Sequence, residues 1–249
     1  MLSIIILTKN SEETLADTIE SLKNFGDQLI VVDSGSDDRS VEVAKHLGAT
    51  VFKNKFEDFS AQRNFAISKA NNPWVLYIDD DEQITEEFKK EVKNTIAAYD
   101  KNSEIGGYYI RRKTFYYGKD WGFADKVQRL FYKEKFTRWH GVVHETPTIK
   151  GAFGEIERPI NHYTHRSLSQ MVEKTNEWSE YEAELRIKAG HPEMTWWRFF
   201  RVIVTAFFKS YVFEKGYKNG TEGIIEAIYQ SFSIFITYAK LWEMQREKK

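Results

Sequence analysis

The chain has 249 residues, 41% of them hydrophobic and 29% charged, which suits one large folded domain or a domain with an appended segment. Lys and Arg total 36 against 37 Asp and Glu, which excludes the positive field that general nucleic-acid binders need. Cysteine is absent, which excludes disulfides, cysteine-ligated zinc, iron–sulfur clusters and thiol nucleophiles and fits a reducing, cytoplasmic location.

The first hundred residues predict strands and helices in alternation. The apolar start of the chain has no basic segment or small-residue cleavage site, so it predicts a strand rather than a signal peptide. Short apolar runs typical of strands buried on both faces occupy residues 4–7, 29–32, 50–52 and 74–78. Helical spacing of apolar residues covers 15–22, 41–47, 60–70 and 86–99, the last segment following a capping residue, Thr85. This order predicts an α/β fold with an open, mostly parallel sheet and a ligand crevice at the carboxyl ends of its strands.

The second half predicts further strands and then helices. Strand patterns occupy 108–112, 127–132 and 160–163. From residue 168 the chain is predicted to be helical, with interruptions at 190–192 and 216–223. Its longest uncharged stretch, 227–239, has 13 residues and is shorter than the roughly 18 of a membrane-spanning helix.

Four acidic residues directly follow the strand at 74–78, namely Asp79, Asp80, Asp81 and Glu82. Adjacent carboxylates repel one another unless a cation neutralises them. Mg²⁺ and Mn²⁺ prefer carboxylates together with phosphate oxygens, so the cluster predicts a divalent metal site at a strand end. The alternative is a solvated acidic turn that opens the next helix.

Polar residues also end the first two predicted strands. Asp33 stands at the end of one and Thr8 at the end of the other, so three strand ends are expected to share one crevice. Asp33 is suited to accept hydrogen bonds from a base or ribose. Asp37, Asp38 and Ser40 are explained as well by capping of the following helix.

Four sequence blocks, in order and spacing, resemble the signature of family 2 glycosyltransferases with the GT-A fold. They are Ser3 to Asn10, Val31 to Asp37, Gln62-Arg63-Asn64 and Tyr77 to Asp81. Later blocks at 128–131 and 141–145 are similar to the branch that contains lipopolysaccharide-core β-1,4-glucosyltransferases. The resemblance implies a GT-A catalytic domain over residues 1–165, with a Rossmann-like nucleotide-binding half, and a helical C-terminal extension over 166–249.

The resemblance also implies roles for individual residues. Contacts to the nucleotide of the donor are expected from Thr8, Glu12, Asp33, Arg63, Asp79 and Asp80. Asp79 and Asp81 would form the Asp-x-Asp pair that holds ribose, diphosphate and Mn²⁺ or Mg²⁺, and His162 or His165 would add a late metal ligand. A hydrogen-bonded structural histidine, or a guanidinium paired with a surface acid in the case of Arg63, is the alternative.

Glycosyl transfer needs a general base for the acceptor hydroxyl, and we assign that role to Glu145, with His144 as an orienting or metal-binding neighbour. Gln128 and Arg129 are adjacent on a predicted strand, so only one of them can face the crevice, toward acceptor or donor. Trp139 is either an apolar platform for a sugar ring or a core residue.

Residues 186–218 contain seven basic residues, two acidic residues and nine aromatic ones. Basic charge beside exposed rings is typical of a segment on an anionic membrane surface, whereas packing against the catalytic domain is the alternative.

Together with these patterns, the resemblance implies an inverting, metal-dependent transferase that moves a hexose from a uridine-linked nucleotide sugar to a hydroxyl of a cell-envelope glycan or glycolipid. A noncatalytic nucleotide-sugar-binding protein is the first alternative. A metal-dependent phosphatase is the second, although Gln83 stands where such enzymes need Thr or Val.

Overall fold

The computed structural model describes residues 1–141, 145–164 and 166–247, and these form two compact units. The first unit comprises Met1–Thr114 and Ala124–Tyr163. The second comprises Phe115–Phe123 together with the chain from Thr164 onward. Each unit is described separately below.

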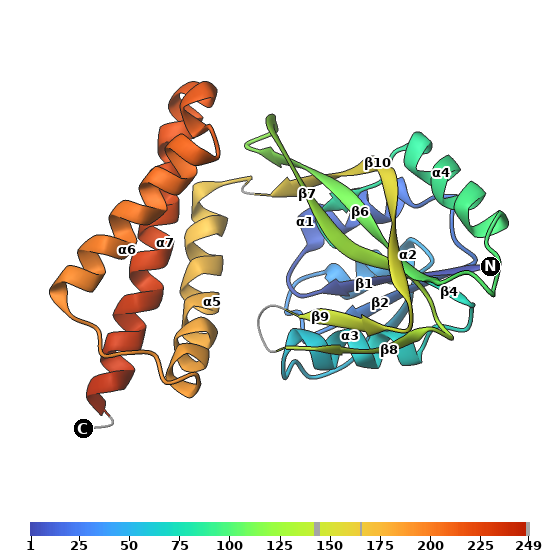
Figure 1. Ribbon diagram of the computed structural model, residues 1–249, viewed down its shortest axis with the longest axis horizontal. Coiled ribbons are helices and arrows are strands. Elements are labelled where there is room, and N and C mark those ends of the chain that lie inside the picture. The colour runs from blue at the N-terminus through green and yellow to red at the C-terminus, as the bar shows by residue number, and fades with distance from the viewer. Residues whose placement is uncertain (142–144, 165, 248–249) are drawn as a thin grey trace. The chain divides into compact units, whose positions relative to one another are not determined.

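The first unit contains an eight-stranded sheet with the order β3-β2-β1-β4-β7-β6-β10-β5. The four strands at one side of it are mutually parallel: β1 (Leu2–Thr8), β2 (Gln28–Asp33), β3 (Thr50–Lys53) and β4 (Trp74–Asp79). Figure 1 shows these strands side by side, with the chain passing through a helix between each and the next. The register places Thr8 opposite Asp33 and Leu7 opposite Asp79, so these strands end at one edge.

Alternation of side chains along β1 divides the core into two layers. Ile4 and Ile6 lie in one buried cluster and Ile5 lies in the other, because successive side chains of a strand point to opposite faces. Three helices contribute to the first cluster: α1 (Glu12–Ser21), α2 (Ser40–His46) and α4 (Glu86–Ala97). The second cluster is covered by α3 (Phe59–Ser68) and a small two-stranded sheet of β8 (Phe136–His140) and β9 (Thr146–Ile149). A strand buried on both faces explains the uninterrupted apolar run at the start of the chain.

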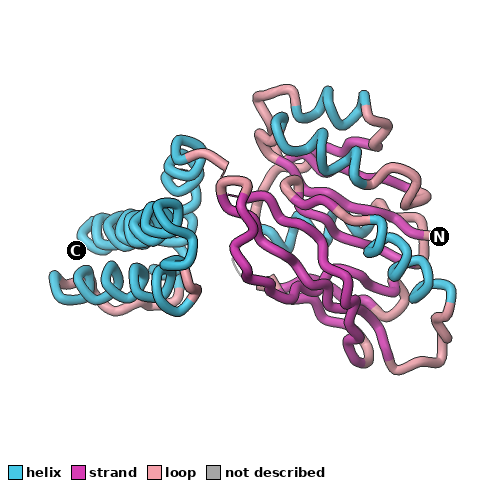
Figure 2. Tube along the Cα trace, turned by 90° about the horizontal axis from the view of Figure 1, so that it is seen from above, coloured by secondary structure: helices cyan, strands magenta, loops and turns pink. Residues whose placement is uncertain are grey.

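The remaining strands complete the sheet beside β4. They are β5 (Glu82–Gln83), β6 (Ile105–Tyr116), β7 (Lys119–Tyr132) and β10 (Ala152–Thr164). β7 runs antiparallel to β4, and β5 pairs antiparallel with β10, which places His162 opposite Glu82. Figure 2 shows the strands as one twisted sheet. A strand late in the chain, β10, therefore pairs with the segment that directly follows β4.

The second unit is built from α5 (Leu168–Lys188), α6 (Trp196–Phe208) and α7 (Gly220–Glu247), with α7 packed against both of the others. A π-helical turn (Lys209–Phe213) and a 3-10 turn (Gly216–Asn219) lead into α7. Glycine is required at Gly223, because a Cβ there would lie 1.8 Å from the carbonyl oxygen of Gly216. In the described parts of the chain no helix combines the length and apolar character that a bilayer-spanning segment requires.

The α/β fold predicted from the sequence is confirmed, as are the four parallel strands and the helices between them. Thr85 caps α4 as predicted, accepting the Phe88 N–H at 3.1 Å. The sequence analysis missed β5, β8 and β9, which are strands of two to five residues without clear alternation.

Candidate active site

The carboxyl ends of β1, β2 and β4 carry Thr8, Asp33 and Asp79, and the strand register brings all three to one edge. Thr8 is buried, and its hydroxyl oxygen has no hydrogen-bond partner among the described residues. A buried polar atom without a partner costs free energy, so it marks a position that a ligand can satisfy. The predicted convergence of three strand ends is thus present.

Asp33 organises the loop that follows β2. Its side chain is fully buried, and its carboxylate accepts N–H groups from Gly35 at 3.2 Å and from Ser36 at 3.1 Å. Gly35 has a φ of +98°, which lets the loop turn back over the carboxylate. Asp33 therefore shapes the loop in this structure, and its contact with a nucleoside remains a proposal.

The loops after β1 and β2 are joined by hydrogen bonds between their side chains and backbone. The carboxylate of Glu12 accepts the N–H of Arg39 at 2.9 Å, and the Glu12 N–H donates to Asp38 at 3.0 Å. Asp38 also accepts the N–H of Ser40 at 2.9 Å, as expected of a residue at a helix start. Burial opposes ionisation of Asp38, but these hydrogen bonds outweigh it and lower its pKa. Glu12 thus joins the two loops.

Asp79 is surrounded by guanidinium groups. One carboxylate oxygen lies 3.3 Å from Nη2 of Arg63, and the other is bonded to Arg129 and lies 3.9 Å from Arg112. Burial would raise the pKa of Asp79, but the three arginines hold it well below its usual range. The sequence analysis assigned a metal to this carboxylate, whereas here the neutralising cations are arginine side chains.

Glu82 contacts Asp79 and is fully buried. Its carboxylate accepts the N–H of Asp79 at 2.8 Å and lies 3.4 Å from Arg112. Burial and the neighbouring Asp79 carboxylate raise the pKa of Glu82. Glu82 therefore fixes the backbone at the end of β4 through this hydrogen bond, and it is not part of an exposed acidic turn.

Arg63, on α3, connects Asp79 to the predicted base. Its Nε lies 2.9 Å from Oε1 of Glu145, while Nη2 contacts Asp79. The guanidinium lies 5.3 Å from the ring of Tyr77 and 5.1 Å from that of Trp139, so cation–π contacts hold it between its acidic partners. The structure thus brings Arg63 and Asp79, which the resemblance implied at the nucleotide, together with Glu145, which we assigned as the base.

Of the adjacent pair on β7, Arg129 faces this site and Gln128 does not. Arg129 is 6% exposed and bonds to Asp79, whereas Gln128 donates to the hydroxyl of Tyr109 at 3.2 Å. Trp139 is also buried, at 4% exposed, and packs against Tyr77. The core alternative for Trp139 therefore holds, and its ring supports Arg63 rather than offering an exposed surface to a sugar.

Asp80 and Asp81 point to different partners. Asp80 accepts the hydroxyl of Ser11 at 2.5 Å and so joins β4 to the loop after β1. Oδ1 of Asp81 lies 3.3 Å from Nε2 of His162, on β10. Two atoms that each bind a divalent cation at roughly 2.1 Å are separated by about this distance. Burial lowers the pKa of His162, but the hydrogen bond to Asp81 and its charge outweigh burial and raise the pKa, so the two are a hydrogen-bonded pair here whose spacing is also compatible with two ligands of one metal ion. Within the described residues no group of three or more acids and histidines is arranged to hold a metal.

Sequence reasoning missed Arg112 on β6, which joins Asp79 and Glu82 to Asp125 on β7. Its Nη2 lies 2.6 Å from the carboxylate of Asp125. No local pattern marks Arg112, because its partners come from strands distant in sequence. The predicted roles of His144 and His165 fall on residues outside those the structure describes.

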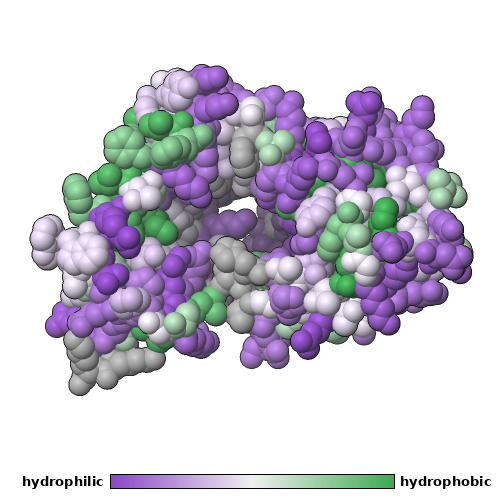
Figure 3. All heavy atoms as spheres, in the orientation of Figure 1, coloured by the Kyte–Doolittle hydropathy of each residue, from purple (hydrophilic) through white to green (hydrophobic). Residues whose placement is uncertain are grey.

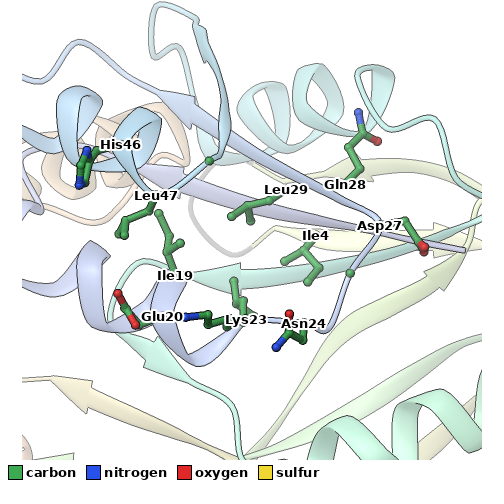
Figure 4. Close-up of a pocket in the computed structure, with 13 residues that line it drawn as sticks. Ile4, Ile19, Glu20, Lys23, Asn24, Asp27, Gln28, Leu29, His46 and Leu47 are labelled. Carbon is green, nitrogen blue, oxygen red and sulfur yellow. The ribbon is translucent and has the colours of Figure 1, made fainter.

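A pocket of about 610 Å³ lies elsewhere in the same unit (Figure 4). It is lined by the ends of α1 and α2 and by Gln28 and Leu29, at the start of β2 rather than at its carboxyl end. Figure 4 shows Ile19, Leu29 and Leu47 around its apolar interior. The pocket shares no lining residue with the site at the carboxyl edge.

Comparison with known proteins gives matches along the chain. The model of the family described as "Glycosyl transferase family 2" matches residues 3–156. An uncharacterized glycosyltransferase of Rickettsia typhi is 30% identical over 100% of this chain and 89% of its own length. The lipopolysaccharide core biosynthesis glycosyltransferase LpsC of Rhizobium meliloti is 25% identical over 97% of this chain and 92% of its own. The solved structures that match include glucosyl-3-phosphoglycerate synthase from Mycobacterium tuberculosis, in complex with Mn²⁺, uridine diphosphate and glucosyl-3-phosphoglycerate. It is 16% identical over 78% of this chain and 81% of that chain, with a TM-score of 0.48.

Proposed function

The chain belongs to glycosyl transferase family 2 and is a glycosyltransferase, and from this premise we propose that it moves a hexose from a uridine-linked nucleotide sugar, with inversion. The proposed acceptor is a hydroxyl of a cell-envelope glycan or glycolipid, such as lipopolysaccharide core. Similarity to LpsC along nearly the whole chain supports this class of acceptor. The proposed location is the cytoplasm, at the inner face of the cytoplasmic membrane.

The observation that carries the proposal is that Glu145 and Asp79 share one guanidinium. Arg63 contacts both carboxylates, at 2.9 Å and 3.3 Å, so the proposed base lies beside the strand end proposed to hold the donor. The orphaned hydroxyl of Thr8 and the carboxylate of Asp33 stand at the adjacent strand ends. This arrangement supports a donor that extends along the carboxyl edge from β2 to β4.

Glu145 is suited to take a proton because only one of its oxygens is bound to Arg63. Oε2 has no hydrogen-bond partner within the described parts of the chain, and the side chain is 17% exposed. In the proposed reaction the acceptor oxygen attacks the anomeric carbon, its proton passes to Glu145, and the bond from that carbon to the diphosphate oxygen breaks. A single displacement of this kind inverts the anomeric configuration.

Asp81 and His162 would hold the metal ion, Mn²⁺ or Mg²⁺. When bound, the ion supplies positive charge that neutralises the departing nucleoside diphosphate. Mg²⁺ is commonly held by one or two carboxylates together with substrate phosphates, so a site with two protein ligands is completed by the donor. Asp79 is less suited, since both of its oxygens contact guanidinium groups.

We expect Asp81→Asn and His162→Gln each to weaken Mn²⁺ binding in the presence of uridine diphosphate by about 10- to 100-fold. The reason is that each variant removes one of two protein ligands. Isothermal titration of Mn²⁺ into the nucleotide-bound protein measures the change. Glu157→Gln, an exposed position on β10, is the matched control and should bind Mn²⁺ as the wild type does. Unchanged Mn²⁺ affinity in both site variants would contradict this assignment.

The identity of the donor nucleotide is tested by thermal unfolding. Tm is measured with uridine, guanosine and adenosine diphosphate sugars, each with and without Mn²⁺. A ligand at 100 times its Kd stabilises the folded protein by about 2.7 kcal/mol, so the matching compound should raise Tm clearly. The largest rise is expected for the uridine compounds with Mn²⁺, and Mn²⁺ alone should have little effect. No rise with any uridine compound would refute the proposed donor.

A further inference from the structure

The outer face of α6 exposes large aromatic side chains. Trp196 is 82% exposed, Phe200 68% and Phe208 52%, and Phe213 in the π-helical turn is 79% exposed. None of the residues of α6 is fully buried. Trp196, Phe200 and Phe208 are four and eight residues apart, which places them on one side of α6, and Phe213 follows in the π-helical turn. Several large exposed rings gathered in one segment mark an interaction site.

Basic side chains without acidic partners border the same rings. The guanidinium groups of Arg198 and Arg201 lie 4.8 Å and 5.7 Å from the ring of Trp197. No carboxylate within the described ranges pairs with either arginine, or with Lys215 or Lys218. By contrast, Arg186 and Lys188 on α5 both pair with glutamates one turn away.

The charge of this segment is strongly positive. Residues 196–218 contain five basic residues and one acidic residue, a net charge of +4. Among the basic residues that the structure describes, Lys209 is the one that pairs with this acid, at 3.8 Å from Glu214. Two copies of the chain that met through this face would bring like charges together, whereas an anionic surface would neutralise them.

We infer that the face formed by Trp196, Trp197, Phe200, Phe208 and Phe213 with the neighbouring basic residues docks on an anionic lipid bilayer. Aromatic rings enter the boundary between headgroups and acyl chains, and the unpaired basic groups meet lipid phosphates. In Figure 3 hydrophobic and strongly hydrophilic side chains alternate over the part of the molecule where Figure 1 places α6 and the turns that follow it. In the following paragraphs this surface is called the α6 face.

A pocket of about 400 Å³ lies between α6, the π-helical turn and α7. Its lining combines Arg201, Thr205, Lys209 and Ser210, which can donate hydrogen bonds, with the carboxylate of Glu214, 3.8 Å from Lys209. This acid opposes an anionic headgroup inside the pocket, so the lipid contact is assigned to the exposed rings and the unpaired basic groups alone.

The inference rests on the proposed function, because a glycolipid acceptor lies in a bilayer and contact with that bilayer would bring the enzyme to it. The binding itself needs neither donor nor acceptor. It is therefore measured with the full-length protein and vesicles alone, so its outcome is independent of the donor and acceptor assignments.

The experiment is co-sedimentation with phosphatidylcholine vesicles and with the same vesicles containing phosphatidylglycerol. We expect binding to the anionic vesicles only, weakened by salt because the Debye length falls from about 30 Å at 0.01 M to about 3 Å at 1 M. Each basic residue near an anionic surface contributes about fivefold, so Arg198→Gln with Arg201→Gln should weaken binding by about 10- to 30-fold.

Phe200→Ser with Phe213→Ser should weaken binding at least about tenfold, because both exposed rings are lost from the bilayer boundary. Tyr181→Ser and Lys188→Gln, exposed positions on α5, are matched controls and should bind as the wild type does. All these side chains are exposed or half-exposed, and equal melting temperatures would show that the variants fold alike.

Absence of wild-type binding to anionic vesicles would overturn the inference. Equal binding to neutral vesicles, or binding that neither set of α6 variants weakens, would do the same. A dimer in light scattering that Phe200→Ser dissociates would assign the α6 face to a second copy of the chain instead.

Discussion

Replacing Glu145 with Gln is expected to lower kcat for sugar transfer by about 10²- to 10⁴-fold while leaving donor affinity near the wild-type value. The amide cannot accept the acceptor's proton, but its oxygen can still accept the hydrogen bond from Nε of Arg63, so the geometry is kept. Transfer from a labelled nucleotide sugar measures kcat, and calorimetric titration measures donor binding.

A control variant and the wild-type assays separate this prediction from the alternatives. Glu134→Gln, in the turn between β7 and β8, is the control and should transfer sugar at the wild-type rate. If Glu145→Gln keeps wild-type transfer, another group is the base. If the wild type binds donor but transfers to no acceptor, the noncatalytic binder is favoured. Release of phosphate from simple phosphoesters without acceptor would favour the phosphatase.

Replacing Arg129 with Met is expected to reduce the free energy of unfolding by about 3–5 kcal/mol. Arg129 is buried and bonds to Asp79, so its loss leaves that carboxylate with one fewer cation in a site closed to water on most sides. Met fills a similar volume, which separates the effect of charge from that of a cavity. Urea denaturation followed by circular dichroism measures the change.

The loss of free energy of unfolding in Arg129→Met should depend on the charge of Asp79. The pKa of Asp79 is lower in the folded protein than in the unfolded chain, so its contribution is present above the unfolded pKa and is lost as pH falls through the folded value. The loss of free energy in Asp79→Asn together with Arg129→Met should therefore be smaller than the sum of the losses in the two single variants. Arg111→Met, an exposed position on β6, is the control and should unfold like the wild type. Equal effects of Arg111→Met and Arg129→Met would show that the buried pair has no special role.

The parallel part of the fold could be predicted because its signals are local. Strands buried on both faces give continuous apolar runs, and the helices between them give regular spacing and a capping residue such as Thr85. The hairpin of β8 and β9 could not be predicted in the same way. Its strands have four or five residues, and what defines them is contact with α3, which lies about 70 residues earlier in the chain.

The acids of the candidate site were predictable from the sequence, as were Arg63 and Arg129 as site residues, but Arg112 and the pairing of all three arginines with Asp79 were not. Asp33 and Asp79 follow apolar runs that end abruptly, so strand direction alone places them at one edge. The sequence analysis inferred a metal to balance this charge, but Asp79 is balanced by Arg63, Arg112 and Arg129. Arg129 lies on β7, the neighbour of β4, and Arg112 lies on β6, the next strand along, so both come near Asp79 only through the sheet order, which no local pattern contains.

The helical unit includes the tip of the β6–β7 hairpin, and so the polypeptide passes between the two units at 114–115, at 123–124 and at 163–164. Within that unit Trp121 is buried and packs against Tyr116, and Tyr117 lies 3.2 Å from the sulfur of Met171. Truncation after residue 165 would remove the contacts that the hairpin tip makes with the helices, Tyr117 with Met171 on α5 and Lys119 with Glu222 on α7, and would leave an exposed apolar surface that promotes aggregation. A shortened enzyme of good solubility would need the tip trimmed as well.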